Sequence, residues 1–517
     1  RRRRQPPLTP LRDALRQPVD GEALGHGVHH PAEALGVVEG DLIVLRGNAV
    51  FEPGSAVTGD VTVVCGNVSN ARAARLAGGL TIYGPSFCGM AASRKAARDD
   101  DWGRTARARA VRTVPPGRAY LTARVYGNYS RVEGLPLALG PVIETGGTYP
   151  FRLEALAVLR TNAGGSLDGT GYIARAEQAI GRGRQFHVGA SVASTVDPIE
   201  ARGMSDLEAS LSSAIFRYDP RDYFLRTGWS AFVRWTPVAS PVSATLEYRD
   251  EEHRSLFVAD VWSLLDDGEA WRPQPIVAEG DLRSLTARFV VDTRDDAEEP
   301  TRGWIVDASL TRSLGGSLAL PEYFRANDLG LPVLVAPTPF DADFTTAILD
   351  ARIYRRIGLG SLLNFRAVAG GALEDRALPP QFQSALGGIP TLPGYDQFAG
   401  DCGARSVHVG REAAQFTPAF FPAYGCDRFV LLQAEYIGDL GIDFELFRYF
   451  DPTWTIFFDV GHGWANGDLA SLRREDTGIL ADAGVGFLIG DLGIYAALPL
   501  EGSNRKATFS LRLGRRF

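Results

Sequence analysis

The sequence has very little lysine, methionine or cysteine, and it has no long apolar run. Its 517 residues include two methionines, four cysteines and two lysines, Lys95 and Lys506. No stretch approaches the roughly 20 apolar residues that a membrane-spanning helix needs, which excludes a helical membrane protein. The net charge of −7 excludes a globally basic surface that would attract nucleic acid. A transmembrane β-barrel stays open, because alternating lipid-facing and lumen-facing residues average out in hydropathy.

The sequence also lacks the common motifs of enzyme chemistry. It has no Gly-x-Ser-x-Gly elbow, no phosphate-binding Gly-x-x-x-x-Gly-Lys-Ser/Thr loop and no His-Glu-x-x-His zinc motif. Its many carboxylates fall on the polar positions of alternating segments. We therefore predict that the protein is not an enzyme and binds no cofactor or catalytic metal.

The four cysteines form no Cys-x-x-Cys pair, which argues against a zinc or redox motif. Cys402 and Cys426 bracket one loop-like segment. We predict a disulfide between them in an oxidising compartment, with two free thiols as the alternative.

Two kinds of sequence precede the main region. Residues 1–34 are polar and aperiodic, and we expect a flexible tail. Within residues 35–88, the segments Gly40–Val44, Gly59–Val63 and Gly78–Ile82 recur at offsets of 19 residues. A fixed period near 20 with one short strand per repeat predicts a small β-solenoid. This segment resembles bactofilin-like, polymer-forming coils.

Residues 89–117 are rich in arginine and end in Pro115-Pro116-Gly117. We expect a solvated linker. A contact with anionic lipid headgroups is the alternative, because clustered arginines bind such surfaces.

From residue 118 to residue 517 the apolar residues recur with a period of two. Ala287 and Phe289, for example, alternate with Thr286 and Arg288. A soluble sandwich and a membrane barrel both show this alternation. Many of the segments reach ten residues, longer than the usual five or six of soluble strands, and this length favours the barrel.

We count sixteen candidate strands, at 119–130, 133–144, 149–160, 169–180, 184–196, 223–236, 241–250, 282–294, 302–313, 344–357, 358–373, 426–438, 452–464, 478–489, 491–499 and 505–517. The connectors on one side are mostly short. Those on the other side are long, at 197–222, 251–281, 314–343, 374–425 and 465–477. This asymmetry is typical of short periplasmic turns and long outer loops, and it places the N-terminus in the periplasm. The sequence therefore predicts an all-β chain, a 16-stranded antiparallel transmembrane β-barrel with a small N-terminal β-solenoid.

Four motifs in this region stand in a characteristic order. They are Asp292–Asp295 followed by Pro300–Gly303, then Gly387–Tyr395, Phe457–Gly461 and a last strand ending at Phe517. Together they resemble the barrel of the bacterial surface-antigen superfamily, which includes BamA and TamA. The resemblance implies a bacterial outer-membrane protein that inserts or exports proteins or lipids across that membrane.

In that superfamily the sixth outer loop, here residues 374–425, folds into the lumen. The resemblance implies that a loop arginine meets acidic residues of the wall. The matching positions are Leu392, Pro393, Gly394 and Tyr395 in the loop tip, and Glu435 and Asp459 in the wall. Pro393 stands where the superfamily has arginine. Since a buried carboxylate without a cation is costly, we expect Arg288 or Arg294 to supply the charge, or Asp459 to be solvated. A tight turn with one packed aromatic is the alternative role of Gly394 and Tyr395.

The end of the chain completes the resemblance. In the superfamily the last strand carries a recognition signal for membrane insertion, and the matching residues on one face are Phe509, Leu511, Leu513 and Phe517. Residues 1–117 lack the βααββ pattern of the POTRA domains found in assembly members. A non-catalytic plugged pore or scaffold in a surface complex is therefore the alternative function. We expect contacts with outer-membrane lipid and lipopolysaccharide, with unfolded clients or with a permanent partner through residues 35–117, and none with nucleic acid.

Overall fold

The computed structural model describes most of residues 117–517 and a set of short segments before them. The segments are 23–26, 32–34, 37–38, 42–45, 49–51, 55–58, 61–64, 68–69, 75–76 and 80–83. After residue 117 the structure leaves out 148, 164–168, 182, 239, 260, 266–267, 269–270, 273, 327–331, 359, 401, 403–408, 411–424, 441–451, 467–475, 491 and 503–505. The chain divides into two compact units, Arg1–Pro116 with Gly146–Thr148, and Gly117–Thr145 with Tyr149–Phe517.

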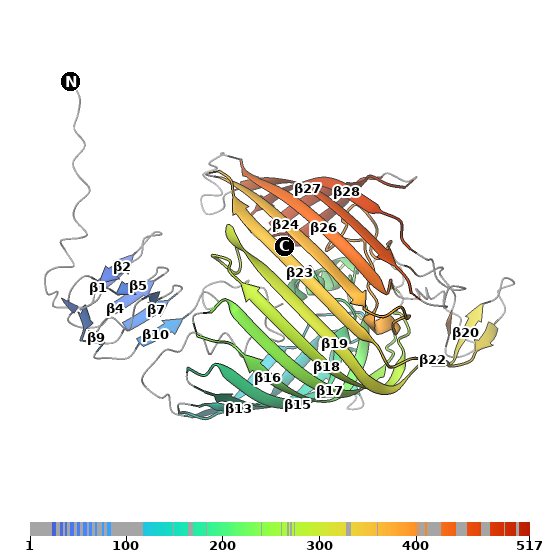
Figure 1. Ribbon diagram of the computed structural model, residues 1–517, viewed down its shortest axis with the longest axis horizontal. Coiled ribbons are helices and arrows are strands. Elements are labelled where there is room, and N and C mark those ends of the chain that lie inside the picture. The colour runs from blue at the N-terminus through green and yellow to red at the C-terminus, as the bar shows by residue number, and fades with distance from the viewer. Residues whose placement is uncertain are drawn as a thin grey trace, which may run out of the picture. The chain divides into compact units, whose positions relative to one another are not determined.

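In the first unit, ten short strands form three parallel sheets that advance by a constant step (Figure 1). The first sheet contains β1 (Ala23–His26), β4 (Leu42–Leu45), β7 (Val61–Val64) and β10 (Leu80–Tyr83). The second contains β2 (Ala32–Ala34), β5 (Ala49–Phe51) and β8 (Val68–Ser69), and the third β3 (Val37–Val38), β6 (Ala56–Val57) and β9 (Arg75–Leu76). Ala23 pairs with Leu42, Leu42 with Val61 and Val61 with Leu80, so each coil takes 19 residues.

The coils stack small apolar side chains inside. Phe51, Val57 and Val61 are at most 1% exposed, which is how a solenoid buries a core between neighbouring coils. Because β1 and β2 continue the 19-residue step, regular structure begins before the tail boundary that we placed at residue 34. The arginine-rich segment 89–116 and the cysteines Cys65 and Cys88 lie outside the described residues.

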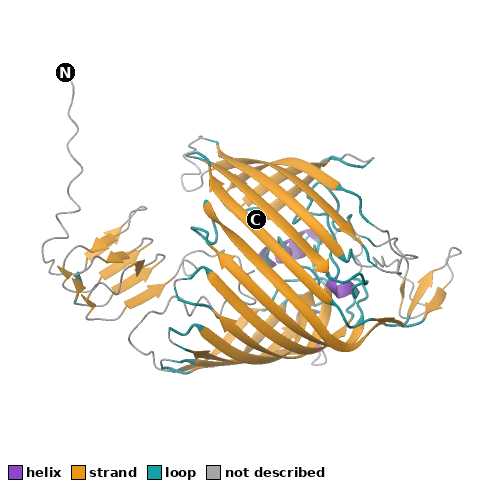
Figure 2. Cartoon of the chain, in the orientation of Figure 1, coloured by secondary structure: helices purple, strands orange, loops and turns teal. Residues whose placement is uncertain are grey.

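The second unit is one antiparallel sheet, and it confirms the predicted all-β class and the sixteen long strands (Figure 2). These strands, each paired with the next in chain order, are β11 (Arg118–Val125), β12 (Pro136–Glu144), β13 (Phe151–Arg160), β14 (Gly171–Ile180), β15 (Phe186–Pro198), β16 (Tyr223–Trp235), β17 (Val242–Arg254), β18 (Glu279–Asp292), β19 (Arg302–Leu320), β23 (Thr345–Arg356), β24 (Ser361–Ala372), β26 (Arg428–Asp439), β27 (Pro452–Trp464), β28 (Leu480–Ile489), β29 (Leu492–Pro499) and β30 (Thr508–Leu513). Figure 1 shows the sheet curling into a barrel of strongly tilted strands. Among the described residues, no helix is both long and apolar enough to cross a membrane.

Short elements lie in the long connectors. The three-residue β22 (Thr338–Phe340) extends the sheet beside β19, and β20 (Tyr323–Ala326), β21 (Pro332–Val335) and β25 (Val409–Gly410) form a small separate sheet. The helical elements of the second unit are α3 (Asp206–Phe216) and the 3-10 turns η4 (Thr161–Ala163) and η6 (Pro380–Phe382).

The two faces of the sheet differ in chemistry. On the outward face, Leu246 is 49% exposed and Phe289 is 45% exposed. On the inward face, Arg288 contacts Asp307 at 2.6 Å and Arg366 contacts Asp350 at 2.7 Å. Alternate residues of a strand face opposite sides, so one strand contributes both a greasy outer surface and an ionic inner surface.

The ends of the sheet depart from the sequence prediction. The last strand, β30, stops at Leu513, and Gly514 follows with a left-handed φ of +96°. Phe517 therefore does not extend the apolar face of Phe509, Leu511 and Leu513, and that part of the terminal-strand prediction is wrong. Within the described residues, no hydrogen-bonded ladder joins β11 to β30, so the barrel has an open seam.

Candidate functional site

The loop between β24 and β26 folds onto the inner wall of the sheet. Leu392 near its tip is completely buried, and it packs with Leu386 of the same loop against Val368, Phe429 and Leu431 of the wall. Inward apolar residues on neighbouring strands thus make a small greasy floor for the loop. Burying a leucine of this kind contributes about 1.5–3 kcal/mol, enough to retain the loop against the wall.

Two glycines form the turn that shapes this loop tip. Gly387 and Gly388 have φ angles of +106° and +84°, and the Gly388 amide donates to the Tyr395 carbonyl at 3.1 Å. A Cβ on Gly388 would lie 1.8 Å from Oε1 of Gln397. Both the left-handed backbone and the close side chain require glycine here.

The tip contacts β28 through two hydrogen bonds. The Gly394 amide donates to Oδ2 of Asp482 at 2.5 Å, and the Tyr395 hydroxyl donates to the Ala481 carbonyl at 3.0 Å. A Cβ on Gly394 would lie 2.7 Å from the Cβ of Asp482, so the close approach also depends on glycine. These two residues therefore combine the tight turn and packed aromatic with a fixed contact to the wall.

Two further bonds tie the tip to strands on either side. The Thr508 hydroxyl of β30 donates to the Pro393 carbonyl at 2.5 Å, and Nε2 of Gln433 in β26 donates to the Thr391 carbonyl at 2.8 Å. The loop thereby holds the last strand of the sheet as well as its own flanking strand.

Asp459 receives its positive partner from the end of the chain. Nη2 of Arg516 donates to Oδ2 of Asp459, and both side chains are at most 3% exposed. The Arg516 guanidinium also lies 3.8 Å from the centroid of the Phe457 ring, a favourable cation–π arrangement. The left-handed turn at Gly514 brings Arg516 into the interior.

The expected partners of Asp459 are engaged elsewhere. Arg288 is bound by Asp307 at 2.6 Å, and Arg294 is bound by Asp292 at 2.8 Å. The expectation that one of them would serve Asp459 is therefore wrong, as is the alternative of a solvated Asp459. Both arginines found an acid closer in the chain or in cross-strand register.

The interior around Asp459 holds more acid than base. Glu435 and Asp482 are at most 1% exposed, and Asp482 stands directly opposite Asp459 on the neighbouring strand. Glu435 accepts a hydrogen bond from the Thr455 hydroxyl at 3.1 Å. Like charges opposite one another are unfavourable, so Arg516 has the central electrostatic role in this cluster.

A second loop, between β15 and β16, meets the same region (Figure 2). It contains α3, whose N-cap Ser205 accepts from the Glu208 amide at 3.1 Å. Glu208 binds Arg512 of β30 at 3.1 Å. Nε2 of Gln397 in the sixth loop donates to the Pro220 carbonyl at 2.9 Å, so the two loops are joined inside the barrel.

Cys402 and Cys426 form a disulfide with an S–S distance of 2.05 Å. Both are at most 1% exposed. A Cβ on Gly463 of β27 would lie 2.7 Å from Sγ of Cys426, so the bridge packs closely on the wall. It closes the far end of the sixth loop.

Three interior residues of this site were not among the sequence candidates. They are Asp482, Arg512 and Arg516. Alternation offered a signal for two of them, because Asp482 and Arg512 occupy inward positions in otherwise apolar strands. Arg516 had no such signal, because it follows the end of the last strand.

Comparisons with known proteins identify the type of fold only. No protein-family model matches the sequence, and no curated protein matches it. Among solved structures, BamA from Haemophilus ducreyi lacking POTRA domains 1–3 is similar, with a TM-score of 0.47 and 13% identity over 78% of this chain and 71% of that chain. CdiB from Escherichia coli follows with 0.32 and 12%, over 78% and 64%. The copper transporter OprC has 0.32 and 9%, over 78% and 57%.

Proposed function

We propose that this chain is a β-barrel of a bacterial outer membrane, with the N-terminus in the periplasm. Exposed leucine and phenylalanine side chains face outward along the long strands, and ion pairs such as Arg366–Asp350 face inward. In water such an outer face would be a large aggregation surface. In a bilayer it is the expected lipid-facing band.

We further propose that the barrel inserts or exports proteins or lipids through its open seam. The observation that carries this proposal is the absence of a ladder between β11 and β30 within the described residues. Leu121 on β11 is 81% exposed and Phe509 on β30 is 78% exposed. An unpaired strand edge templates the addition of another strand, so each side of the seam offers a start for an incoming chain.

The interior loops support this role by fixing one side of the seam. Thr508 and Arg512 of β30 are held by Pro393 of the sixth loop and by Glu208 of α3. These contacts do not use the backbone edge of β30. The strand therefore keeps its position while its edge stays available.

Covalent closure of the seam tests this proposal. Cysteine pairs introduced along β11 and β30, in a variant without other cysteines, are oxidised in cells depleted of the native protein. We expect closure to lower the amounts of other outer-membrane proteins or of exported lipid. The matched control is Ala123→Cys with Leu139→Cys, which crosslinks register partners of an existing ladder. Undiminished levels with the seam closed contradict the proposal.

A non-catalytic plugged pore or scaffold is the second candidate function. It is favoured by the two loops that cross the interior and contact each other through Gln397 and Pro220. Native-detergent purification distinguishes the candidates. Transient unfolded clients support assembly or export, whereas a permanent partner at constant stoichiometry supports the scaffold.

A further inference from the structure

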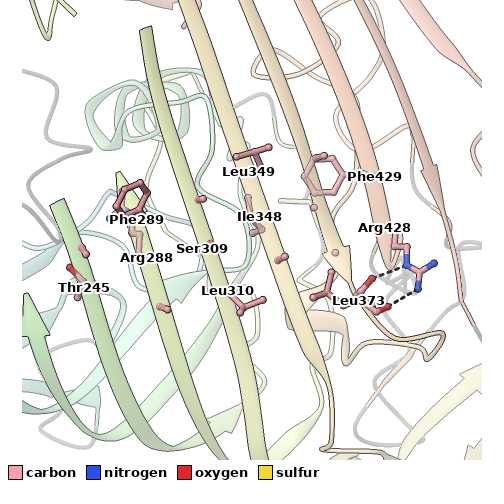
Figure 3. Close-up of a pocket in the computed structure, with 18 of the residues that line it drawn as sticks. Thr245, Arg288, Phe289, Ser309, Leu310, Ile348, Leu349, Leu373, Arg428 and Phe429 are labelled. Atoms are coloured by element: carbon pink, nitrogen blue, oxygen red, sulfur yellow. Dashed lines mark hydrogen bonds between the residues drawn. The ribbon is translucent and has the colours of Figure 1, made fainter. Parts of the chain in front are cut away.

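The outward face of β16 to β27 carries an apolar hollow of about 1190 Å³ (Figure 3). Pockets for small molecules usually measure about 300–1,000 Å³, so this hollow has room for a long apolar ligand. It does not open into the interior site, because the side chains that form its walls belong to the outward face.

Alternation of small and large residues across the strands creates the hollow. In one cross-strand row, Ala244 pairs with Phe289, Phe289 with Ala308, Ala308 with Leu349, and Leu349 with Ala369. Partners in an antiparallel ladder share one face. Alanines therefore form the floor, while Phe289 and Leu349 form raised walls.

A second row continues the pattern one step along the strands. Leu310 pairs with Ala347, and Ala347 pairs with Gly371. Figure 3 shows Leu310, Leu349 and Phe289 beside one another on this surface. The two rows together make a channel that runs across the strands.

The channel joins the two edges of the apolar band. At one end stands Trp235, followed by a short connector, and at the other stands Trp464, followed by a long one. Tryptophans of barrels mark the two membrane–water interfaces. An occupant would thus meet apolar surface along its length and a polar boundary at the end.

Positive charge stands at the long-loop end of the channel. Arg428 lines the hollow, and its guanidinium donates to the carbonyls of Ala372 at 2.7 Å and Glu374 at 2.8 Å (Figure 3). Neutral carbonyls orient the guanidinium without cancelling its charge. Arginine is well suited to phosphate, because its planar fork of donors matches phosphate oxygens.

We infer that this hollow binds one lipid of the surrounding leaflet, with an acyl chain in the alanine-floored channel and its phosphate at Arg428. The inference rests on the proposed membrane location. An acyl chain fits a narrow channel that is apolar along its length and cationic at one end. A second copy of the barrel would present a broad convex surface instead, which does not enter the channel.

Filling the channel tests the inference. Ala308→Phe and Ala347→Phe place bulk where the acyl chain would lie, and strands tolerate outward aromatics. The matched control is Ala496→Phe, an outward position of β29 outside the hollow. The probe is phosphatidylglycerol with brominated chains, whose binding in detergent micelles quenches tryptophan fluorescence, and phosphatidylcholine with the same chains is the zwitterionic arm.

We expect each filling variant to weaken phosphatidylglycerol binding by about tenfold or more, and the control to leave it unchanged. Arg428→Gln should remove the preference for phosphatidylglycerol over phosphatidylcholine. Native mass spectrometry should show about one retained phospholipid in the parent protein and none in the filling variants. Equal quenching in parent and filled proteins, or a dimer in place of the lipid, overturns the inference. A protein that stays dissolved without detergent overturns the proposed membrane function instead.

Discussion

Replacing Arg516 by methionine tests the interior cluster most directly. The variant keeps much of the apolar volume of the side chain and removes its charge. Asp459 then stays in a site where it is completely buried and stands opposite Asp482. The contact of the Arg516 guanidinium with the Phe457 ring, at 3.8 Å, is lost as well.

The expected loss of stability is large. Removing one partner of a buried ion pair costs about 3–5 kcal/mol, because the other charge stays buried without compensation. The lost cation–π contact adds up to about 2 kcal/mol. Replacing both charges, in Arg516→Met with Asp459→Leu, should restore most of the stability, because an apolar pair of similar volume often substitutes well for a buried ion pair.

Guanidinium unfolding of the detergent-solubilised protein, followed by tryptophan fluorescence, measures these changes. Arg515→Met is the matched control, since Arg515 donates one hydrogen bond at 3.3 Å to the Pro300 carbonyl. We expect a much lower midpoint for Arg516→Met than for Arg515→Met. Equal midpoints, or a double variant as unstable as the single one, would refute the argument that Arg516 neutralises Asp459.

Three further outcomes follow from the loops and turns. Gly394→Val should destabilise the protein by about 1–3 kcal/mol through overpacking against β28, while Gly358→Ala, at an open position, should be neutral in the same unfolding assay. Replacing Cys402 and Cys426 by serine should cost about 3 kcal/mol, because the bridge closes a loop with a sequence separation of 24; an unchanged midpoint contradicts this. Burial raises the pKa of Asp295, but hydrogen bonds within its turn outweigh it and hold the pKa at about 2. The turn should thus keep its full stability above about pH 4 and lose it as the pH falls through 2, measured by amide exchange against Asp295→Asn.

The strand count was predictable because the sheet separates two environments. Alternation of residues such as Phe289 and Arg288 has a period of two, and a shift by one residue would bury every charge on the wrong side. The helix in the β15–β16 loop was predictable from Ser205 and Glu208, whose capping interaction is local.

The partner of Asp459 was not predictable, because it depends on a change of chain direction. Gly514 ends the alternation, and its left-handed φ sends Arg516 inward. No periodic pattern describes a four-residue tail. The first solenoid coil did have a signal: Gly21 and Glu22 stand 19 residues before Gly40 and Asp41. It was weak, because a single apolar pair follows those residues.

The two sides of the seam are held by different forces. β30 has six residues, a length at which edge strands are weakly held by pairing alone. Its inward residues Thr508 and Arg512 add contacts to both interior loops. β11 is linked to the wall through its ladder with β12 and through the ion pair of Arg124 with Glu154. Since the Arg124 side chain is partly exposed, that pair adds little stability. The loops therefore anchor β30 from within, and β11 is the side of the seam that moves when a new strand is admitted.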